Sequence, residues 1–184
     1  MMNNINPSDW IVNQVELITK KNKINTIIDV ACGFGRHSVY LANKNYKVVS
    51  IDIDFKKLRT FTNNKNIRSA CLNLENHEYW PIQSYFDIVI VVNYLYRSNF
   101  KNILNLVKKD GYLIYETFCV GNEKYGKPKR KEYLLENKEL ESEIKGLINL
   151  NLKNLKKHFK KYNKQKNNVL KAHYDYCFEL LKDY

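Results

Sequence analysis

The sequence lacks the features that mark several large protein classes. Its four cysteines lie far apart, form no CxxC pair and have no histidine at ligand spacing, which argues against a disulfide framework and a zinc site. Its longest aliphatic run, Ile88 to Val92, is far shorter than the ~20 apolar residues that span a membrane. The first ten residues resemble no leader peptide. We therefore expect a cytoplasmic protein with no metal and no membrane partner.

Arginine is scarce, although the chain is strongly basic. There are 31 Lys and Arg against 19 Asp and Glu, a net charge of +12, and nearly all of the cations are lysine. Arginine is the better ligand for phosphate and guanine, so the charge alone does not establish a nucleic-acid partner. The Lys-rich stretch 151–171 leaves two interpretations open, a solvated surface or a contact with RNA.

Only three prolines interrupt the chain, and its length suits one domain, 1–184. We expect an N-terminal helix within 1–22, a cofactor-binding core over 23–118, and a substrate-side loop with a basic C-terminal region over 119–184. In the first part, Ser8 follows a proline and precedes an apolar stripe, so it is the expected N-cap of the helix.

Strand and helix patterns alternate through the core. Buried β-branched runs predict strands at 26–30, 47–52, 67–72, 86–92 and 112–118, and helical periodicity predicts helices at about 36–44, 55–63 and 100–107. This alternation predicts a doubly wound, mostly parallel α/β sheet of the Rossmann-like kind, with its ligand site at the carboxyl ends of the strands.

The last third of the chain has weaker patterns. Residues 109–111 indicate the turn that ends the helix before the fifth strand, and 132–147 has a helical pattern. Residues 169–178 alternate apolar and polar side chains, which predicts a late antiparallel strand. Its expected partner is 147–155, and 156–168 is either an exposed connection or a basic helix.

The segment Asp29-Val-Ala-Cys-Gly-Phe-Gly is the most informative in the chain. A strand leads into small residues at Ala31, Gly33 and Gly35, which let a ligand approach the backbone closely. A carboxylate at Asp29 would repel the pyrophosphate of a dinucleotide, whereas it suits the ammonium and sulfonium groups of S-adenosylmethionine. The third glycine of a dinucleotide fingerprint is also missing, because position 38 is Ser.

Polar residues end the next two strands. Asp52 lies nineteen residues after Gly33, near the spacing at which an acid binds ribose hydroxyls. Asp54 is better placed to cap the helix that begins near residue 55. Asn73 is a candidate for the adenine amino group, with Leu74 against the ring, although an Asx turn explains Asn73 about as well.

Together these motifs resemble the class I S-adenosylmethionine-dependent methyltransferases, over at least residues 8–140. Within that superfamily the chain is similar to a group of small bacterial enzymes distantly related to tellurite-resistance and thiopurine-type methyltransferases; the residues that carry this narrower match are 86–97, 115–118, 121–123 and 125–128. The resemblance implies S-adenosyl-L-methionine as the cofactor. Similar sequences tend to have Asp where this chain has Asn73, so the adenine contact is expected to be weaker.

An acceptor for the methyl group should approach over the ends of the fourth and fifth strands. Asn93 is expected beside the cofactor there, and Tyr94, Arg97 and Glu116 are the catalytic candidates, to orient, clamp or deprotonate the acceptor. His37 is a further candidate for contact with the substrate.

A small-molecule acceptor is favoured, because the chain has neither a double proline after the fourth strand nor a Pro-Cys pair for base methylation. Two alternatives stay open. One is a methyltransferase-fold protein that binds RNA or a ribonucleoprotein through its basic tail, with weak or no catalysis. The other is a nucleotide-dependent oxidoreductase.

Overall fold

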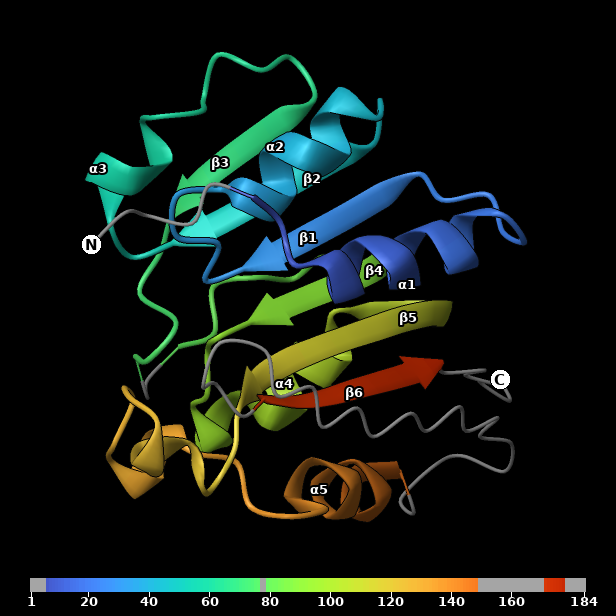
Figure 1. Ribbon diagram of the computed structural model, residues 1–184. Coiled ribbons are helices and arrows are strands. Elements are labelled where there is room, and N and C mark those ends of the chain that lie inside the picture. Colours follow the sequence, from blue (N-terminus) through green and yellow to red (C-terminus); the bar gives the residue numbers. More distant parts are fainter. Residues whose placement is uncertain (1–5, 77–78, 149–170, 178–184) are drawn as a thin grey trace.

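The protein folds around one six-stranded sheet in the order β3-β2-β1-β4-β5-β6 (Figure 1). The computed structural model describes residues 6–76, 79–148 and 171–177. Its strands are β1 (Thr26–Val30), β2 (Lys47–Asp52), β3 (Ile67–Cys71), β4 (Phe86–Val92), β5 (Val107–Phe118) and β6 (Lys171–Cys177). Its helices are α1 (Asp9–Thr19), α2 (Arg36–Asn43), α3 (Phe55–Leu58), α4 (Phe100–Asn105) and α5 (Glu139–Ile148), with single 3₁₀ turns at Arg97–Asn99, Asn122–Lys124 and Lys131–Tyr133.

The first five strands are parallel, and β6 runs antiparallel to β5 along its whole length. The predicted doubly wound Rossmann-like sheet is therefore confirmed. The late strand also forms within its predicted range and pairs with β5, whereas most of the partner we expected, 147–155, lies outside the described residues.

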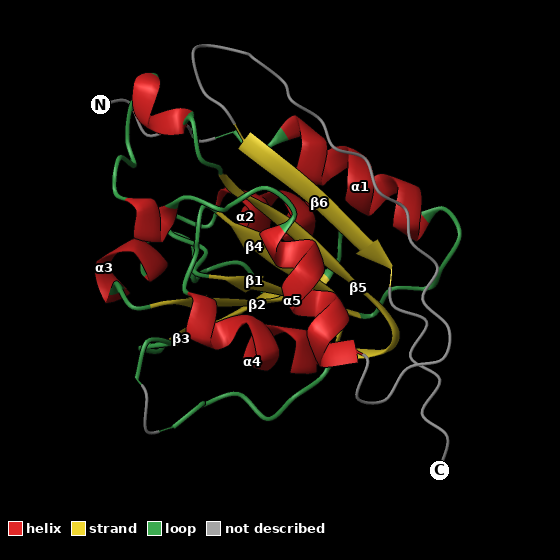
Figure 2. Ribbon diagram, turned by 90° about the horizontal axis from the view of Figure 1, so that it is seen from below, coloured by secondary structure: helices red, strands yellow, loops and turns green. Residues whose placement is uncertain are grey.

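Helices cover both faces of the sheet (Figure 2). Successive residues of a strand point to opposite faces, so Ile27 packs with α1 and α2 while Ile28 packs with α4. The central strand β4 is buried at every position, as its uninterrupted apolar run predicts. These two apolar layers hold the sheet between its helices. The ends of the strands lie outside them and can carry the polar residues of a site.

Strand order reverses between β1 and β4, since β2 and β3 lie to one side of β1 and β4 and β5 to the other. Loops leaving the carboxyl ends of these two strands therefore diverge. This topological switch point is where parallel α/β folds bind ligands, and it places the residues after Val30 and Val92 at the candidate site.

Three predicted elements differ from the structure. The helix expected over 55–63 is only Phe55–Leu58, followed by turns. Residues 109–111 form no helix-ending turn, because β5 already begins at Val107 and passes through them with Asp110 at φ 60°. An irregularity in the pairing between Phe86 and Ile88 of β4 accommodates this stretch.

The helix predicted over 132–147 is also displaced. Residues 131–133 form a 3₁₀ turn, Leu135 makes an isolated bridge to Cys119, and the helix begins at Glu139. Leu135 is fully buried in the core. The apolar residue that the sequence assigned to a helix therefore lies in the loop that returns from β5. The stretch 156–168 lies outside the described residues.

Candidate functional site

The loop between β1 and α2 has three residues in the left-handed backbone region. Ala31, Gly33 and Gly35 have φ of 54°, 60° and 70°. A Cβ on Gly35 would lie 2.5 Å from the Phe61 ring, so this glycine is required by packing as well as by conformation. A Cβ on Gly33 would meet nothing within 4 Å. The open side of the loop is therefore at Gly33, where a ligand can approach the backbone.

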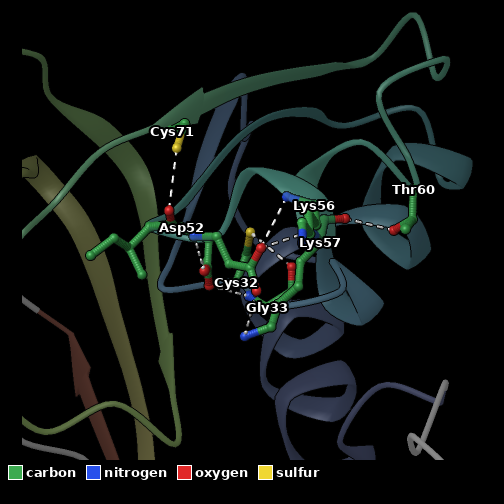
Figure 3. A network of polar contacts seen from close by, with 9 residues as sticks. Cys32, Gly33, Asp52, Lys56, Lys57, Thr60 and Cys71 are labelled. Atoms are coloured by element: carbon green, nitrogen blue, oxygen red, sulfur yellow. Dashed lines mark hydrogen bonds and ion pairs between the residues drawn. The ribbon is translucent and has the colours of Figure 1, made fainter.

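Asp52 connects the end of β2 to this loop (Figure 3). Its Oδ2 accepts a hydrogen bond from the Gly33 N–H at 2.7 Å, and its Oδ1 accepts one from the Asp54 N–H at 2.9 Å. Each carboxylate oxygen has two lone pairs, so both retain capacity for a further donor. The predicted neighbours Gly33 and Asp52 thus lie together, and Asp52 can hold the loop and accept ligand hydroxyls at the same time.

Asp29 has a structural role that the sequence did not predict. The side chain is 1% exposed, and its Oδ2 accepts hydrogen bonds from the Ser38 N–H at 3.1 Å and the Ser38 hydroxyl at 2.6 Å. Burial raises its pKa to about 6, against the opposing effect of the Ser38 bonds. These contacts anchor α2 to the end of β1, so Asp29 shapes the loop from behind, and the direct cation contact stays a prediction.

Near β3, the structure favours the alternative interpretation of Asn73. Its Oδ1 accepts a hydrogen bond from the Glu75 N–H at 3.0 Å, which is an Asx turn. Leu74 is 6% exposed and packs into the core with Val91 and Leu95, so it presents little surface to a ring. Both of these adenine contacts stay predictions.

Ile53 is an apolar candidate that sequence reasoning missed. It follows Asp52 directly and is 65% exposed, which is unusual for isoleucine. Its position offers an aliphatic surface beside the carboxylate that would bind a ribose. The sequence does carry a signal for it, an apolar residue between two acids just after a predicted strand. Only the two acids were given roles, one as a ribose ligand and one as a helix cap.

At the end of β4, Asn93 occupies the left-handed region at φ 57° and is exposed. Its N–H donates to the Glu116 carbonyl at 2.8 Å, which extends the β4–β5 pairing by one step. Asparagine tolerates this conformation better than most residues. Asn93 therefore ends the strand at the switch point with its side chain outside the core, as a cofactor contact requires.

Tyr94 belongs to a buried hydrogen-bond network. Its hydroxyl accepts from Asn99 Nδ2 at 3.0 Å, and the same nitrogen donates to the Leu74 carbonyl at 2.7 Å. The Tyr115 hydroxyl donates to the Tyr94 carbonyl at 2.6 Å. Burial raises the pKa of Tyr94 to about 12, so the phenol stays protonated at neutral pH. The contacts support a positioning role, and the phenol is unsuited to be a base.

Arg97 points to the loop that returns from β5. Its guanidinium forms an ion pair with Glu139 and donates to the carbonyls of Glu132 at 2.8 Å and Leu134 at 3.0 Å. The hydrogen bond to Glu139 raises its pKa further. Arg97 thus fastens the returning loop, and an anion clamp would have to compete with these partners.

Glu116 is 1% exposed near the end of β5 and accepts a hydrogen bond from the Ser8 hydroxyl at 2.5 Å. The Ser8 N–H donates to His37 Nε2 at 3.1 Å, and His37 is 3% exposed in the first turn of α2. Ser8 is the N-cap residue of α1, as expected, and its carbonyl accepts a hydrogen bond from the Val12 N–H, but its hydroxyl points to Glu116 and makes no side-chain cap bond. The structure thereby brings two candidates together that the sequence treated separately.

Other site types find little support within the described ranges. Residues 6–76, 79–148 and 171–177 contain no group of three His, Cys, Asp or Glu side chains arranged for a metal ion. No described helix combines the length and the apolar character needed to cross a bilayer. Most of the Lys-rich stretch 151–171 lies outside the described residues, so its predicted RNA contact is untested.

The glycine loop, the acid at the end of β2 and the strand order define a Rossmann-like methyltransferase fold. Residues 27–111 match the family model described as "Methyltransferase domain". This match covers β1 to the first part of β5, and thus both Gly33 and Asp52. The resemblance to the class I methyltransferase superfamily is confirmed.

Individual relatives agree with this class. YqeM of Bacillus subtilis, whose own name assigns it to the methyltransferases provisionally, is 29% identical over 49% of this chain and 41% of its own length. The crystal structure of TehB from Haemophilus influenzae has a TM-score of 0.62 at 18% identity and covers 93% of this chain and 61% of TehB. An S-adenosylmethionine-dependent methyltransferase from Clostridium acetobutylicum has a TM-score of 0.50 at 22% identity and covers 65% of this chain and 51% of its own. The chain thus spans less than two thirds of each relative.

Proposed function

We propose that this protein is a methyltransferase that uses S-adenosyl-L-methionine and transfers its methyl group to a small-molecule acceptor. The observation that carries the proposal is the bond between Asp52 and the Gly33 N–H, which joins the strand-end acid to the open side of the glycine loop. In the proposed complex the ribose hydroxyls donate to Asp52, and Ile53 lies against the adenine.

The charges near the loop favour a cofactor without phosphate. Asp29 lies in β1 two residues before Ala31, and Asp52 accepts a hydrogen bond from the Gly33 N–H, so a pyrophosphate at the loop would approach two carboxyl groups. S-adenosylmethionine carries a sulfonium and an ammonium group, so the same field favours it. The methyltransferase named from Clostridium acetobutylicum supports this choice through its shared fold.

The catalytic task of such a site is mainly alignment. Methyl transfer from a sulfonium is an in-line displacement, so the chain must hold an acceptor lone pair behind the methyl carbon and exclude water. Tyr94, through its carbonyl and hydroxyl, positions the turn after β4, and Arg97 holds the returning loop beside it. Glu116 is the candidate to receive a hydrogen bond or a proton from the acceptor.

Calorimetry with S-adenosylhomocysteine, the demethylated product, tests the proposal. We expect binding to the wild-type protein and no binding of NAD under the same conditions. Asp52→Ala should lower the affinity by about 1 to 3 kcal/mol, because two ribose hydroxyls lose their acceptor. Asp54→Ala is the matched control, since this neighbouring acid caps α3 by accepting a hydrogen bond from the Lys56 N–H and forms an ion pair with Lys57. Tight binding of NAD alone, or equal affinities of the Asp52 and Asp54 variants, would contradict the proposal.

A further inference from the structure

The contacts of Ser8 form a second recognition feature beside the glycine loop. Ser8 reaches two buried acceptors with two donors, its hydroxyl to Glu116 Oε2 at 2.5 Å and its backbone N–H to His37 Nε2 at 3.1 Å. The acceptors come from elements on opposite sides of β4, since His37 lies in the first turn of α2 and Glu116 near the end of β5. Ser8 therefore bridges the switch point of the sheet.

The Glu116 side chain lies on the same face of the sheet as this bridge. Ile114 packs with α1 and α2, and side chains two residues apart on a strand share a face. Glu116 thus points to the α1 and α2 side at the carboxyl end of β5. Its carbonyl also holds Asn93 at the end of β4, so the carboxyl group sits where the fold brings an acceptor toward the cofactor.

Ser8 makes this distant contact without forming the usual side-chain cap bond. It occupies the N-cap of α1, where a serine hydroxyl ordinarily accepts a hydrogen bond from the second or third N–H of the helix. Here the hydroxyl donates to a carboxyl group 108 residues away. The side chain is turned toward Glu116, and its oxygen accepts no hydrogen bond from the first turn of α1.

The segment before Ser8 lies at the protein surface. Asn6 is exposed, and its carbonyl accepts a hydrogen bond from Arg36 at 3.3 Å, a long contact on the protein surface. Ser8 itself is half-buried, while the two groups it binds are almost fully buried. The exchangeable member of the cluster is therefore Ser8, and the fixed members are Glu116 and His37.

The spacing of the two donors defines a chemical class. In Ser8 the nitrogen and the hydroxyl oxygen are separated by two carbon atoms, Cα and Cβ, which is the arrangement of a vicinal amino alcohol. A ligand that replaces Ser8 must supply donors to the same carboxyl oxygen and imidazole nitrogen at the same separation. In the orientation of Ser8 the hydroxyl of the ligand would donate to Glu116 and its amine to His37, and the charge of a cationic amine, two carbon atoms from that hydroxyl, would lie near the Glu116 carboxyl group.

We propose that Glu116 and His37 are the acceptor-recognition pair, that Ser8 occupies this pair in the unliganded protein, and that the acceptor carries a vicinal amino-alcohol group. This inference rests on the proposed function and specifies its substrate class. Glu116 and His37 would bind substrates that offer two hydrogen-bond donors at this spacing and would reject substrates that offer none.

Ethanolamine is the smallest probe of this class, and 1,2-dimethoxyethane is its matched control, with two heteroatoms at the same spacing but no donor. Both are titrated into the full-length ¹⁵N-labelled protein with S-adenosylhomocysteine present, and amide shifts are recorded. In the wild-type protein we expect ethanolamine to move the amide resonances of Ser8 and Asp9, because Ser8 is displaced, and 1,2-dimethoxyethane to leave them unchanged.

Variants test whether Glu116 binds the probe and whether Ser8 competes with the probe for it. Ser8→Gly removes the hydroxyl at little cost to an N-cap, so ethanolamine should bind at least tenfold more tightly than to the wild-type protein. Adding Glu116→Gln to Ser8→Gly should abolish that gain. Thr19→Gly removes a hydroxyl from the other end of α1, where it donates to the Glu16 carbonyl, and should change nothing.

Three results overturn the inference. They are equal shifts with both probes, no shift at Ser8 in the wild-type protein, or an unchanged ethanolamine affinity in a folded Ser8→Gly variant. A parallel titration with S-adenosylhomocysteine distinguishes the two proposals. If it binds while ethanolamine fails, the recognition pair is wrong and the proposed function stands, whereas failure of S-adenosylhomocysteine itself overturns both.

Discussion

At the scale of single residues, the site is built from acids that act on the backbone. Asp52 holds the Gly33 and Asp54 N–H groups, and Asp29 holds Ser38. The sequence predicts both acids as ligands for a cofactor, and the structure shows that each also organises the loop that would bind it. A carboxylate with spare lone pairs can do both, and this double use explains why the spacing of acids around the glycine loop is so informative.

The raised pKa of Asp29 predicts how the stability of the folded protein depends on pH. Its pKa of about 6 in the folded protein lies above the value of ~3.9 in an unfolded chain, so between these pH values the folded state binds a proton that the unfolded state has released. The contribution of Asp29 to stability is therefore largest below about pH 4 and falls as the pH rises to about 6. In Asp29→Asn this dependence disappears.

Urea unfolding between pH 4 and 7 measures the effect. The free energy of unfolding of the wild-type protein, minus that of Asp29→Asn, should fall by about 1.4 kcal/mol per pH unit at most between about pH 4 and pH 6, and should level off above pH 6. Asp54→Asn, which removes the same charge from the same edge of the sheet, is the control. A difference that is independent of pH would show that Asp29 titrates normally.

At the scale of elements, the sequence predicts what is periodic and misses what depends on distant partners. The bounds of β1, β2 and β4 are those expected, because buried β-branched runs and the turn residues after them are local signals. The helix after Asp54 is shorter than its pattern suggests, although its cap by Asp54 is confirmed.

Ser8 is the N-cap residue of α1, as predicted, but the side-chain cap bond expected there and the helix expected from residue 132 fail to form for a common reason. In each case a residue that local sequence rules assign to a helix makes a contact with a residue far away in the sequence. Glu116 takes the Ser8 hydroxyl, and the bridge to Cys119 takes Leu135. Neither partner can be found from neighbouring sequence. The Asx turn at Asn73, by contrast, was one of the two readings that local chemistry allowed.

The returning loop after β5 depends on Arg97. Arg97→Lys keeps the charge but loses the planar fork that reaches Glu132, Leu134 and Glu139 together. We expect faster amide hydrogen exchange in residues 131–139, corresponding to about 1 kcal/mol of lost protection, since the exposed ion pair itself is screened by water.

Hydrogen exchange followed by mass spectrometry measures this protection. Arg130→Lys, in the same loop, is the matched control and should exchange like the wild-type protein. If both variants behave alike, Arg97 does not fasten the loop, and its use as a substrate clamp regains support.

At the scale of the whole molecule, one sheet brings four separate stretches of the chain to a single edge. The glycine loop after β1, Asp52 after β2, Asn93 after β4 and Glu116 near the end of β5 are far apart in sequence and meet because parallel strands end on the same side. The reversal of strand order at β1 and β4 lies between them. The fold thus provides one half of the edge for a cofactor and the other half for an acceptor.

The most direct measurement of this account is a crystal structure of the protein with S-adenosylhomocysteine. We predict that both ribose hydroxyls lie within hydrogen-bond distance of the Asp52 carboxylate, that the ligand backbone passes Gly33, and that its sulfur faces the side of Glu116. A ligand bound away from this edge, or one whose ribose makes no contact with Asp52, would contradict the assignment.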